Sequence, residues 1–321
     1  MSTATGTAAS LAQIPVVDFA GFASGDPARR AATCAALRRA FETYGFLYLE
    51  NHGVPAAVVD AVFDQARIFF ALPPAAKEAA RPQDPRNTLG YGGLGGQALE
   101  DGRPPDLKEI FQASPEEPWA RPNVWPEGLP GFREAIMAFH TAATNACERL
   151  MQAIAVSLGL PEEYFAPYYD RSDSTARLLH YPPLAEPPAP GQIRAGAHTD
   201  FGGVNLLFPG AEGGLEIQAP SGAWLPTPAR AGTGIVNTGD LIERWTNGQF
   251  RSSPHRVVNP EGAAALRDRY SLVLFHSPNR DAPITCLDPC QSAERPARYP
   301  PITAGAHMRA RIEASRREGY S

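Results

Sequence analysis

Two side chains that bind metals well stand one residue apart in the stretch AGAHTDFGGV, residues 195–204. His198 and Asp200 follow a proline-rich segment and precede an apolar run. On a β-strand, residues i and i+2 point to the same face, so this imidazole and this carboxylate could address one point in space. A surface loop in which the aspartate caps a backbone turn fits the local sequence equally well. A metal site therefore needs a third ligand from elsewhere in the chain.

His255, in the segment SSPHRVV, is the best candidate for that third ligand. It opens a β-branched run 57 residues after His198, whereas His140 and His307 fall on expected helices and His52 in a turn. Two histidines and one carboxylate with open coordination positions form the facial set typical of non-haem Fe(II) oxygenases. The same three residues could in principle hold zinc in a hydrolase.

A second constellation follows in DRYSLVLFHSP, where Arg269 and Ser271 are again two residues apart. An arginine on the inward face of a strand is costly unless it meets an anion, and a guanidinium beside a hydroxyl suits a carboxylate. The alternative is an exposed arginine on an edge strand, paired with an acid such as Asp268. Phe275 follows on the same face and is a candidate to line a substrate pocket, with core packing as the equal alternative.

The overall composition excludes several classes of protein. A chain of 321 residues with 43% hydrophobic residues can bury the core of one large domain or two ordinary ones. A net charge of −5 gives no electrostatic attraction to nucleic acid or to an anionic membrane. No apolar run approaches the ~20 residues of a membrane span, and the N-terminus lacks the features of a signal peptide. The four cysteines form no CxxC pair. We expect a cytoplasmic protein without nucleic-acid or membrane partners; its oligomeric state is not indicated.

Helical signals dominate the first part of the chain. Asp26 as N-cap, Pro27 at the first helical position and Gly45 as the stop predict one helix. Apolar residues at helical spacing predict one long or kinked helix from Pro130 to Gly159. The other expected elements are strands in 14–19 and 46–55, a helix over 55–71 and a long loop over 81–105.

After about residue 170, short apolar runs alternate with glycine and proline turns, which predicts an antiparallel β-sandwich or barrel. Asn237 and Asp240 in VNTGDL are expected to shape a tight turn by bonding to the local backbone. Thr303 caps a final expected helix. We expect a single compact unit with three regions: a mostly helical region over 1–170, a β core over 171–290 and a helical tail over 291–321.

The ordered set His198-Thr199-Asp200, His255 and Arg269-Tyr270-Ser271 resembles the HxD…H…RxS pattern of the Fe(II)/2-oxoglutarate-dependent oxygenases. Within this superfamily the chain resembles the isopenicillin N synthase-like branch. The similarity covers nearly the whole chain, because further landmarks match in the same order: IPVVDF, YGFLYLENHGVP, FFALPPAAK, DLKEIF, LLHYPP, GGLEIQ and IVNTGDLIERW. It implies an α+β fold with a mainly β core, a double-stranded β-helix (jelly roll) with flanking helices.

The resemblance also implies an activity. The two histidines and the aspartate of the pattern would hold Fe(II), while Arg269 and Ser271 would bind the distal carboxylate of 2-oxoglutarate. Tyr181, in LLHYPP, matches a tyrosine whose hydroxyl can reach the cosubstrate or the substrate; a packed sandwich tyrosine is the alternative. With O₂ as the oxidant, such a dioxygenase releases succinate and CO₂ and hydroxylates, desaturates or cyclises a small molecule.

The pattern leaves other chemistries open. In isopenicillin N synthase itself the RxS pair binds the substrate's carboxylate and no 2-oxoglutarate is used. Oxidases of the 1-aminocyclopropane-1-carboxylate type and ethylene-forming enzymes that fragment 2-oxoglutarate are further variants. An inactive jelly-roll binding protein would be expected to lack a ligand or the arginine, and none is missing. The sequence does not identify the prime substrate.

Overall fold

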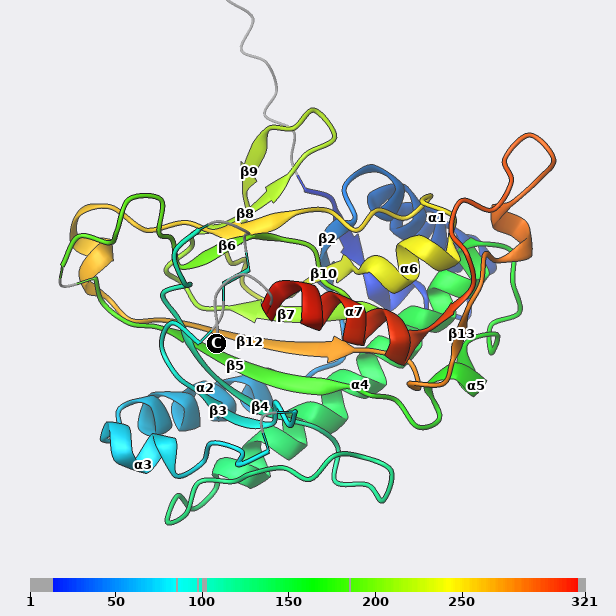
Figure 1. Cartoon of the computed structure of the whole chain (residues 1–321). Coiled ribbons are helices and arrows are strands. Elements are labelled where there is room, and N and C mark those ends of the chain that lie inside the picture. Colours follow the sequence, from blue (N-terminus) through cyan, green and yellow to red (C-terminus); the bar gives the residue numbers. More distant parts are fainter. Residues whose placement is uncertain (1–13, 85, 97, 100–102, 185, 317–321) are drawn as a thin grey trace, which may run out of the picture.

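Two β-sheets, one of eight strands and one of four, form the centre of this protein (Figure 1). The computed structural model describes residues 14–84, 86–96, 98–99, 103–184 and 186–316. The large sheet has the order β1 (Val16–Asp18), β2 (Phe46–Glu50), β10 (Thr233–Thr238), β7 (Val204–Pro209), β12 (Arg269–His276), β5 (Thr175–Tyr181), β4 (Glu109–Ala113) and β3 (Gly90–Gly92). The small sheet has the order β6 (Ala195–His198), β11 (His255–Val257), β8 (Leu215–Gln218) and β9 (Trp224–Pro226).

The chain passes repeatedly between the two sheets. Strands β6, β8 and β11 belong to the small sheet, whereas β7, β10 and β12, which come between or after them in sequence, belong to the large one. All neighbouring strands are antiparallel except β1 and β2. This confirms the predicted mainly β jelly roll with flanking helices. A separate pair of short strands, β13 (Pro283–Ile284) and β14 (Ile302–Thr303), precedes the last helix.

Helices cover one side of the large sheet, and Figure 1 shows α2 and α4 beneath β5 and β12. The helix predicted after Asp26 forms as expected, because the Asp26 carboxylate accepts the amide of Ala28 at 2.9 Å and Gly45 adopts a φ of 65° beyond its end. The helices are α1 (Pro27–Thr43), α2 (Ala56–Phe70), α3 (Pro74–Glu78), α4 (Phe132–Ser157), α5 (Ala166–Tyr169), α6 (Asp240–Trp245) and α7 (Ala304–Arg316), with short 3₁₀ turns at Phe19–Gly21, Gly262–Leu266 and Asp288–Cys290.

The two faces of the large sheet have different neighbours because side chains alternate along each strand. On β12, Leu272 and Leu274 are buried in the core that α1, α2 and α4 share with this sheet. Each such leucine contributes about 1.5–3 kcal/mol by leaving water. Arg269, Ser271 and Phe275 alternate with them and face the small sheet. The inward face of this strand is therefore the polar one, as the spacing of Arg269 and Ser271 predicted.

A second, smaller core fills part of the space between the sheets. Phe46, Ile217, Ile235 and Val257 are among its buried members. The ring of Phe46 reaches the ring of His255, with their centroids 5.3 Å apart. Apolar packing therefore extends from this smaller core to His255, one of the candidate metal ligands.

Several details differ from the expectation. The short strand β3 lies inside the segment 81–105 that was expected to be a loop. Strand β6 ends at His198, so Asp200 lies two residues beyond the strand and not on it. Four strands of the large sheet, β1 to β4, come from the first 170 residues. The three-region division stays a prediction. Within the described ranges, none of the helices has the length and apolar character needed to cross a membrane.

Candidate active site

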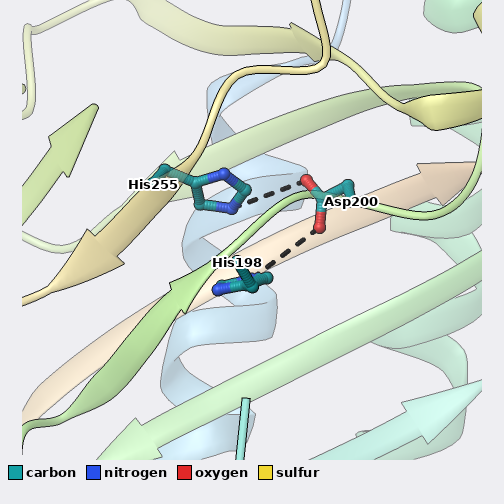
Figure 2. A group of neighbouring side chains, drawn as sticks. All are labelled: His198, Asp200 and His255. Carbon is teal, nitrogen blue, oxygen red and sulfur yellow. Dashed lines mark ion pairs between the residues drawn. The ribbon is translucent and has the colours of Figure 1, made fainter. Parts of the chain in front are cut away.

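The side chains of His198, Asp200 and His255 converge, with one ligand atom from each lying within 4.8 Å of the others (Figure 2). Strands β6 and β11 are antiparallel neighbours, and their register places His198 opposite His255. Asp200 Oδ1 is 4.0 Å from Nε2 of His198, and Oδ2 is 3.6 Å from Nε2 of His255. In the part of the chain that the structure describes, this is the one group of at least three histidine, cysteine or acidic residues with metal-binding spacing. The three predicted ligands are thus brought together.

In both candidate histidines, a contact between Nδ1 and a backbone carbonyl orients the imidazole ring. Nδ1 of His198 lies 2.8 Å from the carbonyl oxygen of Gly196, and Nδ1 of His255 lies 3.3 Å from that of Ser253. Because a carbonyl can only accept, Nδ1 carries the proton in each ring and Nε2 keeps its lone pair. Burial lowers the pKa of His198, and the neighbouring His255 lowers it further, so His198 is neutral at physiological pH. Neutral imidazoles with a free Nε2 are the form that binds a metal ion.

Two amides hold the carboxylate of Asp200. Asn205 on β7 and Asn237 on β10 each donate from Nδ2 to Oδ2 of Asp200 at 2.7 Å. No described residue donates to Oδ1, which leaves that oxygen free for a metal. The expected role of Asn237 in a local turn is therefore wrong, because it lies on a strand and bonds to a side chain 37 residues away. Its inward orientation follows from its spacing of two from the buried Ile235.

Asp240 also differs from the expected turn residue. It starts α6 and accepts a hydrogen bond from Ser252 Oγ, and its carboxylate lies 3.2 Å from Arg311 Nε and 3.5 Å from His307 Nε2. Arg311 on α7 donates to Thr199, the residue between two of the candidate ligands, at 3.0 Å. The last helix is thus attached directly to the loop that carries Asp200.

A buried ion pair that the sequence did not indicate supports strand β6, which carries His198. Lys108 Nζ lies 2.8 Å from Asp106 Oδ2, and both side chains are 3% exposed. Asp106 Oδ1 accepts the amide of Gly196 at 2.9 Å, two residues before His198. Burial lowers the pKa of Lys108, while its contact with Asp106 opposes that change. The pair fixes strand β6 against the segment before β4. The one feature of the sequence that could have drawn attention to Lys108 is that it is one of two lysines in the chain.

The Arg269 side chain lies inside the sandwich, 1% exposed. Its Nε donates to the carbonyl of Gly213 at 2.6 Å, and Nη1 donates to Ser271 Oγ at 2.9 Å. Among the described residues no carboxylate forms an ion pair with it. The exposed edge-strand arginine paired with Asp268 is therefore not what the structure contains; Asp268 bonds to His180 instead, at 2.7 Å. A buried guanidinium with a hydroxyl beside it and no counter-ion is built to receive an anion.

Tyr181 and Phe275 lie on the same inward face of the large sheet. Tyr181 pairs with Arg269 across β5 and β12, and the guanidinium carbon of Arg269 is 4.7 Å from the centre of its ring. Burial raises the pKa of Tyr181, so its hydroxyl stays protonated. Phe275 is only partly buried, and the guanidinium of Arg177 stacks on its ring at 4.5 Å. Both side chains are therefore placed to contact a ligand between the sheets.

The donor set fits a ferrous ion. Two imidazole nitrogens and one carboxylate oxygen on neighbouring segments leave further coordination positions open, which is the arrangement of non-haem Fe(II) oxygenases. The side chains of His198, Asp200 and His255 keep 17%, 11% and 12% exposure, so small molecules can reach them. A zinc hydrolase would leave Arg269 without a ligand. A surface pocket of about 620 Å³ lies near the start of β12, and its lining includes Arg67, Glu212, Asp268 and Tyr270. None of the three candidate metal ligands lines this pocket.

Family models match both halves of the chain. Residues 14–128 match the N-terminal region of non-haem dioxygenases in morphine synthesis, and residues 172–278 match the 2OG-Fe(II) oxygenase superfamily. A proline hydroxylase of Petromyces alliaceus is 35% identical over 89% of this chain and 94% of its own length. A 2-oxoglutarate-Fe(II) type oxidoreductase of Emericella nidulans is 34% identical over 95% of this chain and 92% of its own length.

Solved structures agree with this. Full-length Neurospora crassa T7H in complex with alpha-KG superimposes with a TM-score of 0.86 at 32% identity, covering 94% of this chain and 96% of that one. A 2OG-Fe(II) oxygenase family protein from Caulobacter crescentus has a TM-score of 0.83 at 34% identity, covering 94% and 99%. The chain belongs to the 2OG-Fe(II) oxygenase superfamily. It is a non-haem Fe(II)- and 2-oxoglutarate-dependent dioxygenase.

Proposed function

We propose that His198, Asp200 and His255 hold the Fe(II) of this dioxygenase, and that Arg269 and Ser271 bind the distal carboxylate of 2-oxoglutarate. The observation that carries the proposal is the buried guanidinium of Arg269, which has no carboxylate partner among the described residues. It lies on the face of the large sheet that is directed towards the small sheet, which carries His198 and His255. A buried charge without a counter-ion is costly, so an anion bound beside Arg269 would stabilise this site.

Each residue has a separate task in this scheme. Fe(II) with 2-oxoglutarate supplies the oxidising chemistry, in which O₂ is consumed and succinate and CO₂ are released. The imidazoles present their Nε2 lone pairs because their Nδ1 protons are held by backbone carbonyls. Asn205 and Asn237 fix the Asp200 carboxylate so that Oδ1 is available. Tyr181 packs under Arg269 and keeps its hydroxyl proton for the cosubstrate or the substrate.

For the oxidised substrate we propose a small molecule and hydroxylation as the outcome. In support, one relative is named a proline hydroxylase, and a T7H structure contains thymine together with alpha-KG. Proline and thymine are therefore the first compounds to test. An oxidase that does not use 2-oxoglutarate, or an ethylene-forming variant, is less well supported, because the relatives carry names of 2-oxoglutarate-dependent enzymes. The cytoplasmic location and the lack of a nucleic-acid partner stay predictions.

Binding of 2-oxoglutarate tests the role of Arg269. Isothermal titration of the Mn(II)-loaded protein should show tight binding that Arg269→Met weakens by about 10- to 140-fold, because a hydrogen bond to a charged group contributes about 1.5–3 kcal/mol. Arg269→Lys should lose less, since it keeps the charge but not the two-pronged geometry. Arg38→Met is the control, because Arg38 on α1 donates to the carbonyl of Ser157 on α4 and has no proposed role in binding 2-oxoglutarate. Wild-type affinity in Arg269→Met would show that 2-oxoglutarate binds elsewhere.

Turnover tests the outcome of the reaction. With Fe(II), O₂ and 2-oxoglutarate, a substrate should raise succinate release and gain 16 mass units on hydroxylation. A loss of 2 units would indicate desaturation or ring closure. Substrate oxidation that needs no 2-oxoglutarate would instead support the oxidase alternative.

A further inference from the structure

A second arginine lies on the inward face of the large sheet, and the proposed roles do not use it. Arg177 is the third residue of β5 and pairs with Val273 on β12 and with Gln112 on β4. By strand alternation it shares its face with Tyr181 on β5, and with Arg269 and Phe275 on β12. Its charge is therefore directed into the space between the sheets, where the candidate metal ligands lie.

Two contacts fix the orientation of this guanidinium, one with Gln112 and one with Phe275. Nε donates to Gln112 Oε1 at 2.8 Å, and Gln112 Nε2 donates in turn to the Thr88 carbonyl at 2.6 Å. The opposite contact is with Phe275, whose ring centre lies 4.5 Å from the guanidinium carbon. Among the described residues, neither terminal nitrogen of Arg177 has a hydrogen-bond or ion-pair partner. The side chain thus presents two parallel N–H donors in a fixed direction.

A short chain of contacts connects Arg177 to the candidate metal ligand Asp200. Phe275, on which it stacks, pairs across β12 and β7 with Asn205, and Asn205 bonds to Asp200. Burial lowers the pKa of Arg177 to about 10, and the charge of Asp200 partly opposes this change. The guanidinium therefore carries its charge at neutral pH.

The acidic groups nearby are already occupied. Asp200 is bonded by two amides and is the proposed iron ligand, while Asp106 is paired with Lys108. The distal carboxylate of 2-oxoglutarate is also unsuited, because it is assigned to Arg269. In the β5–β12 register Arg177 and Arg269 are four positions apart, which corresponds to about 13 Å along the strands. The two arginines must serve two different anions.

We propose that Arg177, oriented by Gln112 and Phe275, binds the carboxylate of the molecule that is oxidised, so that the enzyme acts on small carboxylic acids. The two terminal N–H groups form a two-pronged pair with the carboxylate, which fixes the rest of the molecule relative to the metal. Phe275 lines the same site with the part of its ring that the guanidinium does not cover. This inference rests on the proposed positions of Fe(II) and 2-oxoglutarate.

The test uses a panel of amino acids and of aliphatic and aromatic monocarboxylic acids, each paired with its carboxamide. Binding is measured by saturation-transfer NMR on the full-length protein loaded with Zn(II) and 2-oxoglutarate. Turnover is measured as succinate release by the Fe(II) enzyme. Wild type should bind and oxidise at least one acid in preference to its amide. Arg177→Met should weaken binding of that acid by about 10- to 140-fold and leave binding of its amide unchanged.

Two further variants separate recognition from folding. Arg177→Lys should recover part of the lost affinity because it restores the charge, and Gln112→Ala should raise KM for the acid more than it lowers kcat. Arg230→Met is the matched control, since Arg230 also stacks on an aromatic ring, that of Tyr48 at 4.2 Å, but is exposed; it should behave as wild type.

Distinct outcomes separate the two proposals. If no acid of the panel binds wild type, if amides bind as well as acids, or if Arg177→Met retains the affinity for the acid, the carboxylate assignment is wrong. If instead wild type fails to bind 2-oxoglutarate in the titration with Mn(II), it is the proposed function that fails. Retained 2-oxoglutarate affinity in Arg177→Met, together with lost affinity for the acid, supports both.

Discussion

Removing the amide of Asn237 should weaken metal binding without unfolding the protein. The Nδ2 group of Asn237 donates to Asp200 Oδ2 at 2.7 Å, and Asn205 donates to the same oxygen at the same distance. A hydrogen bond to a charged group contributes about 1.5–3 kcal/mol, and residues that orient metal ligands typically change metal affinity by about 10- to 100-fold. Because Asn205 still holds Oδ2 of Asp200, we expect Asn237→Ala to raise the Kd for Fe(II) about tenfold, which is the lower end of this range.

The double variant Asn205→Ala, Asn237→Ala should lose more than the sum of the two single changes, since each amide compensates for loss of the other. Anaerobic calorimetric titration of Fe(II) into the four proteins of this cycle measures the coupling. Asn279→Ala is the matched control, because Asn279 is also buried and donates to a carboxylate, Asp170 at 2.6 Å, but away from the ligands. Unchanged Fe(II) affinity in Asn237→Ala, or an equal loss in Asn279→Ala, would refute the reasoning.

Two other predictions concern stability and the last helix. His276 is fully buried, and burial lowers its pKa to about 3. Below pH ~6.5 the histidine of the unfolded chain therefore takes up a proton that the folded protein does not. The free energy of unfolding should fall by up to ~1.4 kcal/mol per pH unit as the pH is lowered from ~6.5 towards ~3. Urea unfolding at pH 7.5 and 5.5 should show a smaller fall in His276→Asn than in wild type, and an equal fall would contradict this. Arg311→Ala removes the contacts of α7 with Thr199, Asp240 and the ring of Phe201. Amide exchange in α7 should then accelerate, whereas exchange in α4 should not; unchanged exchange in α7 would show that other contacts hold the helix.

The elements that were predicted well are those with local signals. Helix α1 follows from its aspartate cap, its first-turn proline and its terminal glycine, all within 20 residues of sequence. The candidate metal ligands could be selected because the two-residue spacing of His198 and Asp200 and the strand-forming segment after His255 are visible without knowing the fold; the structure brings the three side chains together. Strand β3 was missed because it consists of Gly90, Tyr91 and Gly92, residues that read as loop until β4 pairs with them.

The parts that were missed depend on contacts between distant segments. The bond from Asp106 to the Gly196 amide spans 90 residues, and the bond from Asn237 to Asp200 spans 37. Nothing near Asn237 distinguishes a turn residue from an amide that faces a carboxylate; only the pairing of β10 with β7 brings it to Asp200. The orientation of Arg177 could not be predicted either, because it depends on Gln112 and Phe275 from two other strands.

The metal content of the protein tests the central claim most directly. After anaerobic loading with Fe(II) and removal of the excess, wild type should retain about one iron per chain by elemental analysis. His198→Ala, Asp200→Ala and His255→Ala should each retain little or none at the same concentration, while His307→Ala, whose imidazole faces Asp240, should retain as much as wild type. A full equivalent of iron in any of the three ligand variants, or its loss in His307→Ala alone, would contradict the account.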